Sequence, residues 1–182
     1  GGSQLAAGTV GDITDIGRIF ANTNMAAAAG AVTALIATQL MYKKADLTMV
    51  LNGALAGLVS ITAEPLAPSL LGSLLTGAVG GVIVVVTVPL LDKFKIDDVV
   101  GAIPVHLFAG IWGTLAVGFY TGNFGAQITG ILAYGVFTFV ASLVIWFIFK
   151  AVWGIRVSEE AEINGLDMSE LGMEAYPEFS KG

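Results

Sequence analysis

The sequence contains no cysteine and only one histidine among its 182 residues. The lack of cysteine excludes disulfides, thiolate metal sites and cysteine nucleophiles within this chain, and a lone histidine excludes a site built from several. Charged residues are also scarce, at 12% of the chain, whereas an ordinary soluble domain has about 25%. The formal charge of -6 argues against nucleic acid as a partner, because phosphate binding requires clustered Lys and Arg.

Long apolar runs dominate the sequence. Apolar residues make up 55% of the chain, the mean hydropathy is +0.84, and the main charge-free runs contain 24, 17, 27 and 51 residues. A helix needs about 20 apolar residues to cross a hydrocarbon core about 30 Å thick. The longest run therefore holds two crossings, divided at the turn-rich segment 121–125. We predict an all-α integral membrane protein in a lipid bilayer, with five spans at roughly 18–42, 47–63, 67–91, 99–120 and 126–153.

Residues 1–17 precede the first predicted span. They begin with small residues and then carry Asp12 and Asp15. The sequence predicts the end of an earlier helix here, followed by a loop that contains both carboxylates.

Basic residues in the short loops orient the spans. Positive charge gathers on the cytoplasmic side of a membrane, and all basic residues of 1–156 except Arg18 fall on one side. They are Lys43, Lys44, Lys93, Lys95, Lys150 and Arg156. We therefore predict a transmembrane bundle over residues 1–156 and a cytoplasmic tail over 157–182, which holds seven acids and Lys181. The tail is either solvated and partly disordered, or residues 157–176 dock on the loops that carry the first four of these lysines.

Small residues recur at helix-packing intervals within the spans. The pairs are Gly53 and Gly57, Gly77 and Gly81, and Ala109 and Gly113, and residues 26–31 have no side chain larger than methyl. In lipid, such residues let helix backbones approach closely. We predict a compact polytopic bundle rather than separate anchors.

His106 is the one ionisable side chain deep inside a predicted span. It lies eight residues beyond Asp98, about 12 Å along a helix that starts there, and half of the hydrocarbon core is about 15 Å. Its neighbours at helical spacing are Ala102, Ile103, Ala109 and Gly110. Ionisable groups at this depth are functional by default, and histidine exchanges protons near neutral pH. The alternative is a neutral imidazole that hydrogen-bonds a helix carbonyl.

The remaining polar residues carry less specific signals. Asn24 and Asn52 are expected to make packing hydrogen bonds, and the three tryptophans to pack or to lie at the membrane interface. Asp97 and Asp98 are expected at the N-terminus of the fourth span, where negative charge complements the helix dipole. The sequence has neither a nucleotide-binding glycine pattern nor a nucleophile–base pair, so we predict that it is not an enzyme and has no cofactor.

Four segments resemble the ammonium transporters of the Amt/Mep/Rh family, in the order in which the family has them. They are 22–30 (NTNMAAAAG), 51–59 (LNGALAGLV), 97–115 (which begins DDVVGAIPVH), and the tail segments 165–167 and 172–176. In family terms these are parts of the seventh, eighth and tenth helices and of the cytoplasmic tail. The resemblance implies the second half of an eleven-helix fold, with five full spans and the end of a sixth helix at the start of the chain.

The same resemblance implies site residues and partners. His106 is similar to the second of two facing pore histidines, and Ser3 to the serine of an outer ammonium recruitment site. It further implies a homotrimer completed by an N-terminal half of the transporter, in the plasma membrane (the inner membrane of a bacterium or an archaeon). A PII-type regulatory protein is the implied partner at the cytoplasmic face.

The function predicted on these grounds is ammonium or ammonia transport through an apolar pore with a lining histidine. One alternative is an ammonium-sensing receptor, which we expect less because only residues 157–182 follow the last span in this chain. A second alternative is a structural or accessory membrane subunit, in which His106 merely packs.

Overall fold

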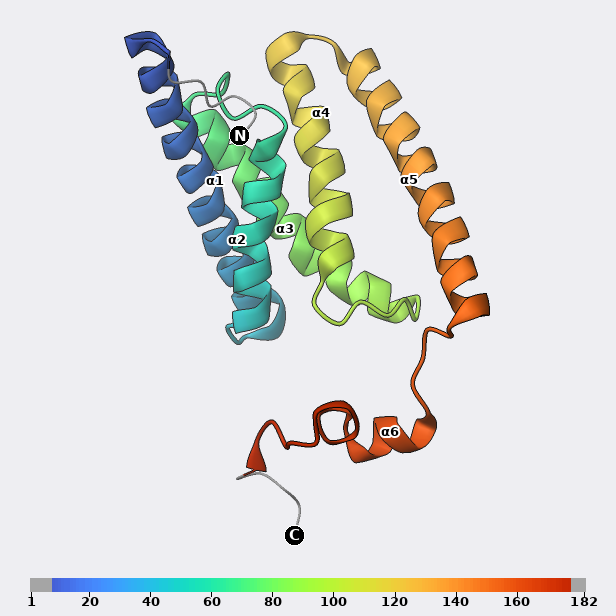
Figure 1. Ribbon diagram of the computed structural model, residues 1–182. Coiled ribbons are helices and arrows are strands. Elements are labelled where there is room, and N and C mark those ends of the chain that lie inside the picture. Colours follow the sequence, from blue (N-terminus) through green and yellow to red (C-terminus); the bar gives the residue numbers. More distant parts are fainter. Residues whose placement is uncertain (1–7, 178–182) are drawn as a thin grey trace. The chain divides into compact units, whose positions relative to one another are not determined.

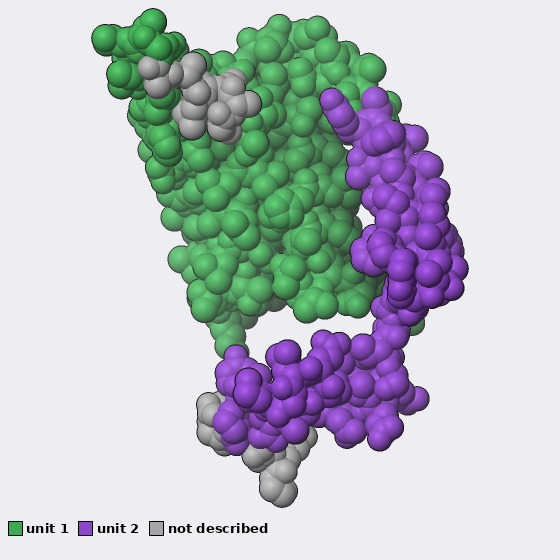
Figure 2. All heavy atoms as spheres, viewed as in Figure 1, with its two compact units in different colours: residues 1–132 green, residues 133–182 purple. Residues whose placement is uncertain are grey.

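The computed structural model of the protein describes residues 8–177 (Figure 1). Every regular element in this range is a helix, which confirms the predicted all-α fold. Two compact units make up the chain, residues 1–132 and residues 133–182 (Figure 2).

The helices overlap the five predicted spans. They are α1 (Val10–Tyr42), α2 (Leu47–Thr62), α3 (Leu70–Lys93), the π-helical turn η2 (Ile103–Phe108) continued by α4 (Ala109–Thr121), and α5 (Phe124–Val152). Four of them are long and apolar enough to cross a membrane: α1, α3, the continuous helix Ile103–Thr121, and α5. The 16 residues of α2 cover about 24 Å at about 1.5 Å per residue, less than a full hydrocarbon core. The described chain is thus that of a multi-pass membrane protein.

The first helix begins earlier than the sequence predicted. Thr9 and Asp12 form a capping box, in which the Thr9 hydroxyl accepts from the Asp12 amide at 3.2 Å and the Asp12 carboxylate accepts from the Thr9 amide at 2.8 Å. The predicted loop around Asp12 and Asp15 is therefore wrong, because both residues lie in the first turns of α1. Carboxylates are favourable there, next to the positive end of the helix dipole.

Glycines of α2 and α3 lie in direct backbone contact with two successive turns of α1. A Cβ added to Gly57 or Gly77 would collide with the carbonyl oxygen of Ala26. One turn further along α1, the carbonyl oxygen of Gly30 meets Gly53 and Gly81 in the same way. Three helix backbones thus touch in two stacked layers, which confirms the predicted small-residue packing and which we call the glycine seam.

The fourth helix joins this group through α2. A Cβ added to Gly113 would lie 2.8 Å from the Cα of Ser60, so no side chain fits between α4 and α2 at this level. A small apolar core then fills the space among α2, α3 and the η2–α4 helix. It consists of Ala56, Val84, Val105 and Ala109.

Asn22 is a buried polar residue that the sequence did not single out. Its side chain is 1% exposed, and its amide donates to the carbonyls of Pro65 at 2.8 Å and Pro68 at 2.9 Å, in the loop between α2 and α3. Replacing Asn22 with alanine leaves the buried Pro65 carbonyl without this donor and the Pro68 carbonyl with only that of Arg18 at 3.3 Å, and we expect a loss of about 1–3 kcal/mol in the free energy of unfolding. Thermal unfolding in detergent measures this loss.

Asn24 provides the matched control for this prediction. It is exposed and donates only to the Phe20 carbonyl of its own helix at 3.0 Å, so Asn24→Ala should change stability by no more than about 0.5 kcal/mol. Equal effects of the two substitutions would contradict the bridging role of Asn22.

The second unit contains the rest of α5 and the tail elements α6 (Glu159–Asn164) and η3 (Asp167–Leu171). None of the 29 residues of α5 is buried within the described chain. Near its end, the ring of Phe149 lies 6.2 Å from that of Trp146 and 5.5 Å from that of Trp153. A salt bridge of 2.7 Å joins the exposed side chains of Arg156 and Glu162 at the beginning of the tail.

Asp167 organises the turn after α6. Its carboxylate accepts from the backbone N–H of Ala175 at 2.8 Å and from that of Met168 at 3.0 Å. These hydrogen bonds, that from Ala175 most of all, lower the pKa of Asp167 below its ordinary 3.8. The charged carboxylate therefore stabilises the turn above pH 3.8, and this stabilisation is lost as the pH falls through the lowered value.

We expect Asp167→Ala to speed hydrogen exchange of residues 167–176 several-fold at neutral pH, measured by mass spectrometry on the full-length protein. Glu170→Ala removes an exposed acid of the same turn that makes no hydrogen bond within residues 8–177, and it should leave exchange unchanged. The difference between the Asp167 variant and the wild type should vanish when the wild-type carboxyl is protonated. A difference that persisted there would contradict the proposed role of the carboxylate.

Candidate functional site

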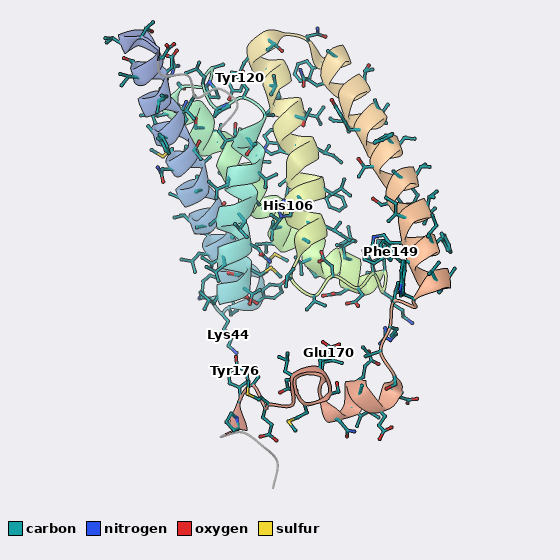
Figure 3. The ribbon with its side chains drawn as sticks, in the orientation of Figure 1. Lys44, His106, Tyr120, Phe149, Glu170 and Tyr176 are labelled. Carbon is teal, nitrogen blue, oxygen red and sulfur yellow. The ribbon has the colours of Figure 1, made fainter. Side chains whose placement is uncertain are left out.

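His106 lies on a π-helical turn at the beginning of the fourth membrane helix (Figure 3). The turn spans Ile103–Phe108, and at its end the amide of Ala109 donates to the carbonyl of Pro104, five residues earlier instead of four. Such turns contain one residue more than an α-helical turn and are frequent at functional sites. No periodic pattern of the sequence indicates this turn.

The helix also begins later than predicted. Gly101 has a φ of 77° and ends a non-helical segment, so the helix starts at Ala102 rather than at 99. The predicted depth of about 12 Å, counted along a helix from Asp98, is therefore wrong as a helical length. His106 lies only about one turn past Ala102.

Contacts with α2 give the depth of His106 on other grounds. The amide of Asn52, in the second turn of α2, donates to the Val100 carbonyl at 2.9 Å. Near the other end of α2, Ser60 meets Gly113. His106 lies between these two contacts in the chain, which places it level with the middle of α2.

The His106 ring is open rather than packed. The side chain is exposed, and no residue within 8–177 makes a hydrogen bond with it, so the alternative of an imidazole bonded to a helix carbonyl has no support in the described chain. Ala102 is exposed and Gly110 half-buried, as expected for its neighbours. Ala109 is fully buried in the core, so this neighbour of His106 faces the other helices.

Asp98 caps the helix that carries His106. One carboxylate oxygen accepts from the Ala102 amide at 2.9 Å, and the other accepts from the Ile103 amide at 2.8 Å. The predicted role of Asp98 at this helix N-terminus is confirmed. Asp97 is exposed and makes no side-chain hydrogen bond within residues 8–177.

Other predicted residues have structural contacts. The indole of Trp112 donates to the Thr76 carbonyl at 2.9 Å, which ties α4 to α3. Asn52 makes the expected packing hydrogen bond, whereas Asn24 bonds only within its own helix. Ser3, the predicted recruitment residue, lies outside the described residues. Within the described range, no cluster of side chains is suited to hold a metal ion.

Apolar membrane helices packed through glycines, with one open histidine level with the middle of α2, define a polytopic membrane protein with one candidate site residue. The profile of the Ammonium Transporter Family matches residues 1–176, and the chain belongs to that family. The family is one of transporters and not of enzymes. The predicted resemblance is thereby confirmed.

Relatives support the same assignment. Ammonium transporter Amt2 of Archaeoglobus fulgidus is 41% identical over 88% of this chain, and the ammonium transporter of Bacillus subtilis is 33% identical over 86%. The matched regions make up 39% and 43% of those two proteins, so the chain spans about two fifths of their length.

Solved structures agree in fold. A structure described as Sensor Amt Protein matches 86% of the chain and 42% of its own, with a TM-score of 0.81 and 30% identity. Mep2 of Candida albicans matches 91% of the chain and 43% of its own, with a TM-score of 0.74 and 25% identity.

Proposed function

We propose that the chain contributes to a membrane pore for ammonium and ammonia, in which His106 lines the pore at mid-depth. The observation that carries the proposal is the open imidazole on the η2–α4 helix, level with the middle of α2 and without a hydrogen-bond partner in residues 8–177. Membership of the Ammonium Transporter Family supports the choice of substrate.

The chemistry of ammonium fits these surroundings. The run 99–149 contains no charged residue, so nothing in it compensates an ammonium ion that has lost its water. Neutral ammonia avoids most of this cost of burial. The ion would therefore release its proton before the apolar part of the pore, and the imidazole would take the place of lost water around the neutral molecule.

The proposed pore requires protein segments in addition to these 182 residues. A second histidine, which faces His106, and most of the outer recruitment site with Ser3 come from an N-terminal half, and the whole forms a homotrimer in the plasma membrane. The open face of His106 and the small share of its relatives that this chain spans support this arrangement.

The tail is proposed to lie on the cytoplasmic side. Residues 157–176 carry most of the excess acid and would dock on the loops with Lys43, Lys44, Lys93 and Lys95 through opposite charge. A PII-type regulatory protein would bind at the same face. The ordered turn around Asp167 supports a tail that is shaped for contact.

A sensor is the second candidate, favoured by the structural match to a protein described as a sensor. The two functions differ in flux. A cell that lacks its ammonium transporters should regain growth on limiting ammonium at acidic pH when it expresses the full-length protein. A sensor would bind ammonium in calorimetry and leave growth unrestored. An accessory subunit would do neither, and either of these results would overturn the proposal.

A further inference from the structure

Each backbone N–H group at the start of the His106 helix has a hydrogen-bond acceptor. Four N–H groups at a helix N-terminus have no partner within the helix. Here those of Ala102 and Ile103 donate to the Asp98 carboxylate, and that of Gly101 donates to the Asp98 carbonyl at 3.3 Å. The fourth position is Pro104, which has no N–H. The first bond within the helix then runs from the Val105 amide to the Gly101 carbonyl at 3.2 Å. Asp98 therefore supplies all three acceptors required, two of them from its side chain.

The segment before the helix is fixed to α2. Asn52 holds the Val100 carbonyl at 2.9 Å, and a Cβ added to Gly101 would lie 2.6 Å from the Asn52 amide nitrogen. Gly101 also has the positive φ that favours glycine. The chain thus enters the helix at one defined place on α2, which we call the entry anchor.

A second fixed point lies beyond His106. Gly113 rests on the Ser60 backbone, and Ala109 is buried in the core with Ala56 and Val84. Between this point and the entry anchor, the chain contains one residue more than an α-helix would hold, and the π turn Ile103–Phe108 absorbs it.

We propose that Asp98 is the positioning residue for His106: by capping Ala102 and Ile103, it holds the entry anchor in place and keeps the π turn from relaxing to an α-helical register. The expected effect of Asp98 on uptake rests on the proposed function, whereas its effect on the position of His106 does not. In an α-helix one residue corresponds to about 100° of rotation, so relaxation would turn the side chains of the turn by up to that angle relative to α4. His106 would then leave its open face.

The rotation can be measured as a change in the accessibility of a thiol introduced at position 106. The 182 residues contain no cysteine of their own, so only the introduced thiol in this region is labelled. In the full-length protein, with any cysteine outside this region replaced, His106→Cys and Phe119→Cys are labelled separately with a small methanethiosulfonate. Phe119 is 68% exposed and lies beyond Gly113, so it serves as the reference site. The measured quantity is the ratio of the two labelling rates.

Three substitutions at the neighbouring aspartates separate capping from charge. Asp98→Ala removes both acceptors, Asp98→Asn keeps one, and Asp97→Ala removes an equal charge that caps nothing. We expect Asp98→Ala to change the labelling ratio about fivefold or more, the equivalent of a lost N-cap. Asp98→Asn should lie between it and the wild type, and Asp97→Ala should match the wild type.

An unchanged ratio with Asp98→Ala would overturn the proposal. Equal effects of the alanine and asparagine variants would overturn it as well, because they would indicate charge and not capping. If Asp98→Ala does not assemble, Asn52→Ala weakens the same entry anchor and should change the ratio in its place. An unchanged ratio in that variant would be equally decisive.

Ammonium uptake by the same aspartate variants with His106 restored distinguishes this proposal from the proposed function. Uptake should fall with Asp98→Ala and stay at the wild-type level with Asp97→Ala. A wild-type protein that carries no ammonium would refute the proposed function, while the labelling ratio would still report whether Asp98 positions residue 106.

Discussion

Replacing His106 with alanine is expected to lower ammonium uptake by about tenfold or more while the protein still folds and assembles. The expected size follows from leaving dehydrated ammonia without its hydrogen-bond partner, since a buried unsatisfied polar group costs about 1–3 kcal/mol and 1.4 kcal/mol is tenfold. The stability of the fold should be unchanged, because the ring is exposed and makes no hydrogen bond within residues 8–177. Uptake into proteoliposomes, compared at equal protein, measures the effect.

Leu107→Ala provides the matched control. Leu107 lies in the same π turn and is 51% exposed, but it has no group that donates or accepts. Its truncation should reduce uptake much less. Unchanged rate and selectivity with His106→Ala would show that the histidine does not line the pore, and an equal loss with Leu107→Ala would assign the effect to side-chain volume.

His106→Asp separates the imidazole chemistry further. A carboxylate at this depth would hold cations rather than a neutral molecule, since it attracts positive charge in a medium of low dielectric constant. We expect this variant to pass potassium, measured as a current carried by that ion in the absence of ammonium.

The second large effect is expected at the glycine seam. Gly77→Ala should destabilise the protein by about 3 kcal/mol or more, because a methyl group there has no flexible side chain to displace. The added Cβ would lie 2.5 Å from the Cα of Ala26 and would also collide with its carbonyl oxygen. The backbones of α1 and α3 would have to separate. The midpoint of thermal unfolding in detergent and the yield of assembled protein both report this.

Gly135→Ala is the control with the same chemistry. Gly135 lies in the middle of α5 and has nothing within 4 Å of an added Cβ. There the methyl group should be neutral or stabilising by up to about 1 kcal/mol, because alanine restricts the unfolded chain. A similar loss in both variants would contradict the idea that backbone contact at the seam is what excludes a side chain.

The sequence predicted the helices, the glycine packing and the capping role of Asp98, because each depends on local patterns. Charge-free length indicates a span, and a spacing of four places Gly53 and Gly57 on one face. The start of α1 is harder to predict, because two nearby carboxylates are as typical of a loop as of a first helical turn, and only the capping-box pattern Thr9-x-x-Asp12 distinguishes the two.

The surroundings of His106 were predictable only in part. Its place as the one ionisable side chain within the fourth span follows from the sequence, whereas its predicted depth was wrong because the helix begins at Ala102. The π turn is not predictable in this way, because the contacts on its two sides, Asn52 with Val100 and Ser60 with Gly113, join residues that are far apart in the sequence.

The glycine seam also sets which motions the molecule can make. Each of two carbonyls of α1, those of Ala26 and Gly30, is seated in a notch between one glycine of α2 and one of α3. Helices in such close backbone contact cannot slide along one another without first moving apart, so α1, α2 and α3 behave as one rigid body. Transporters that expose their site alternately to the two sides rely on rocking or shear between helices. We therefore expect α1, α2 and α3 to keep their positions relative to one another during transport. Any gate must come from rotation of side chains or from segments outside these three helices.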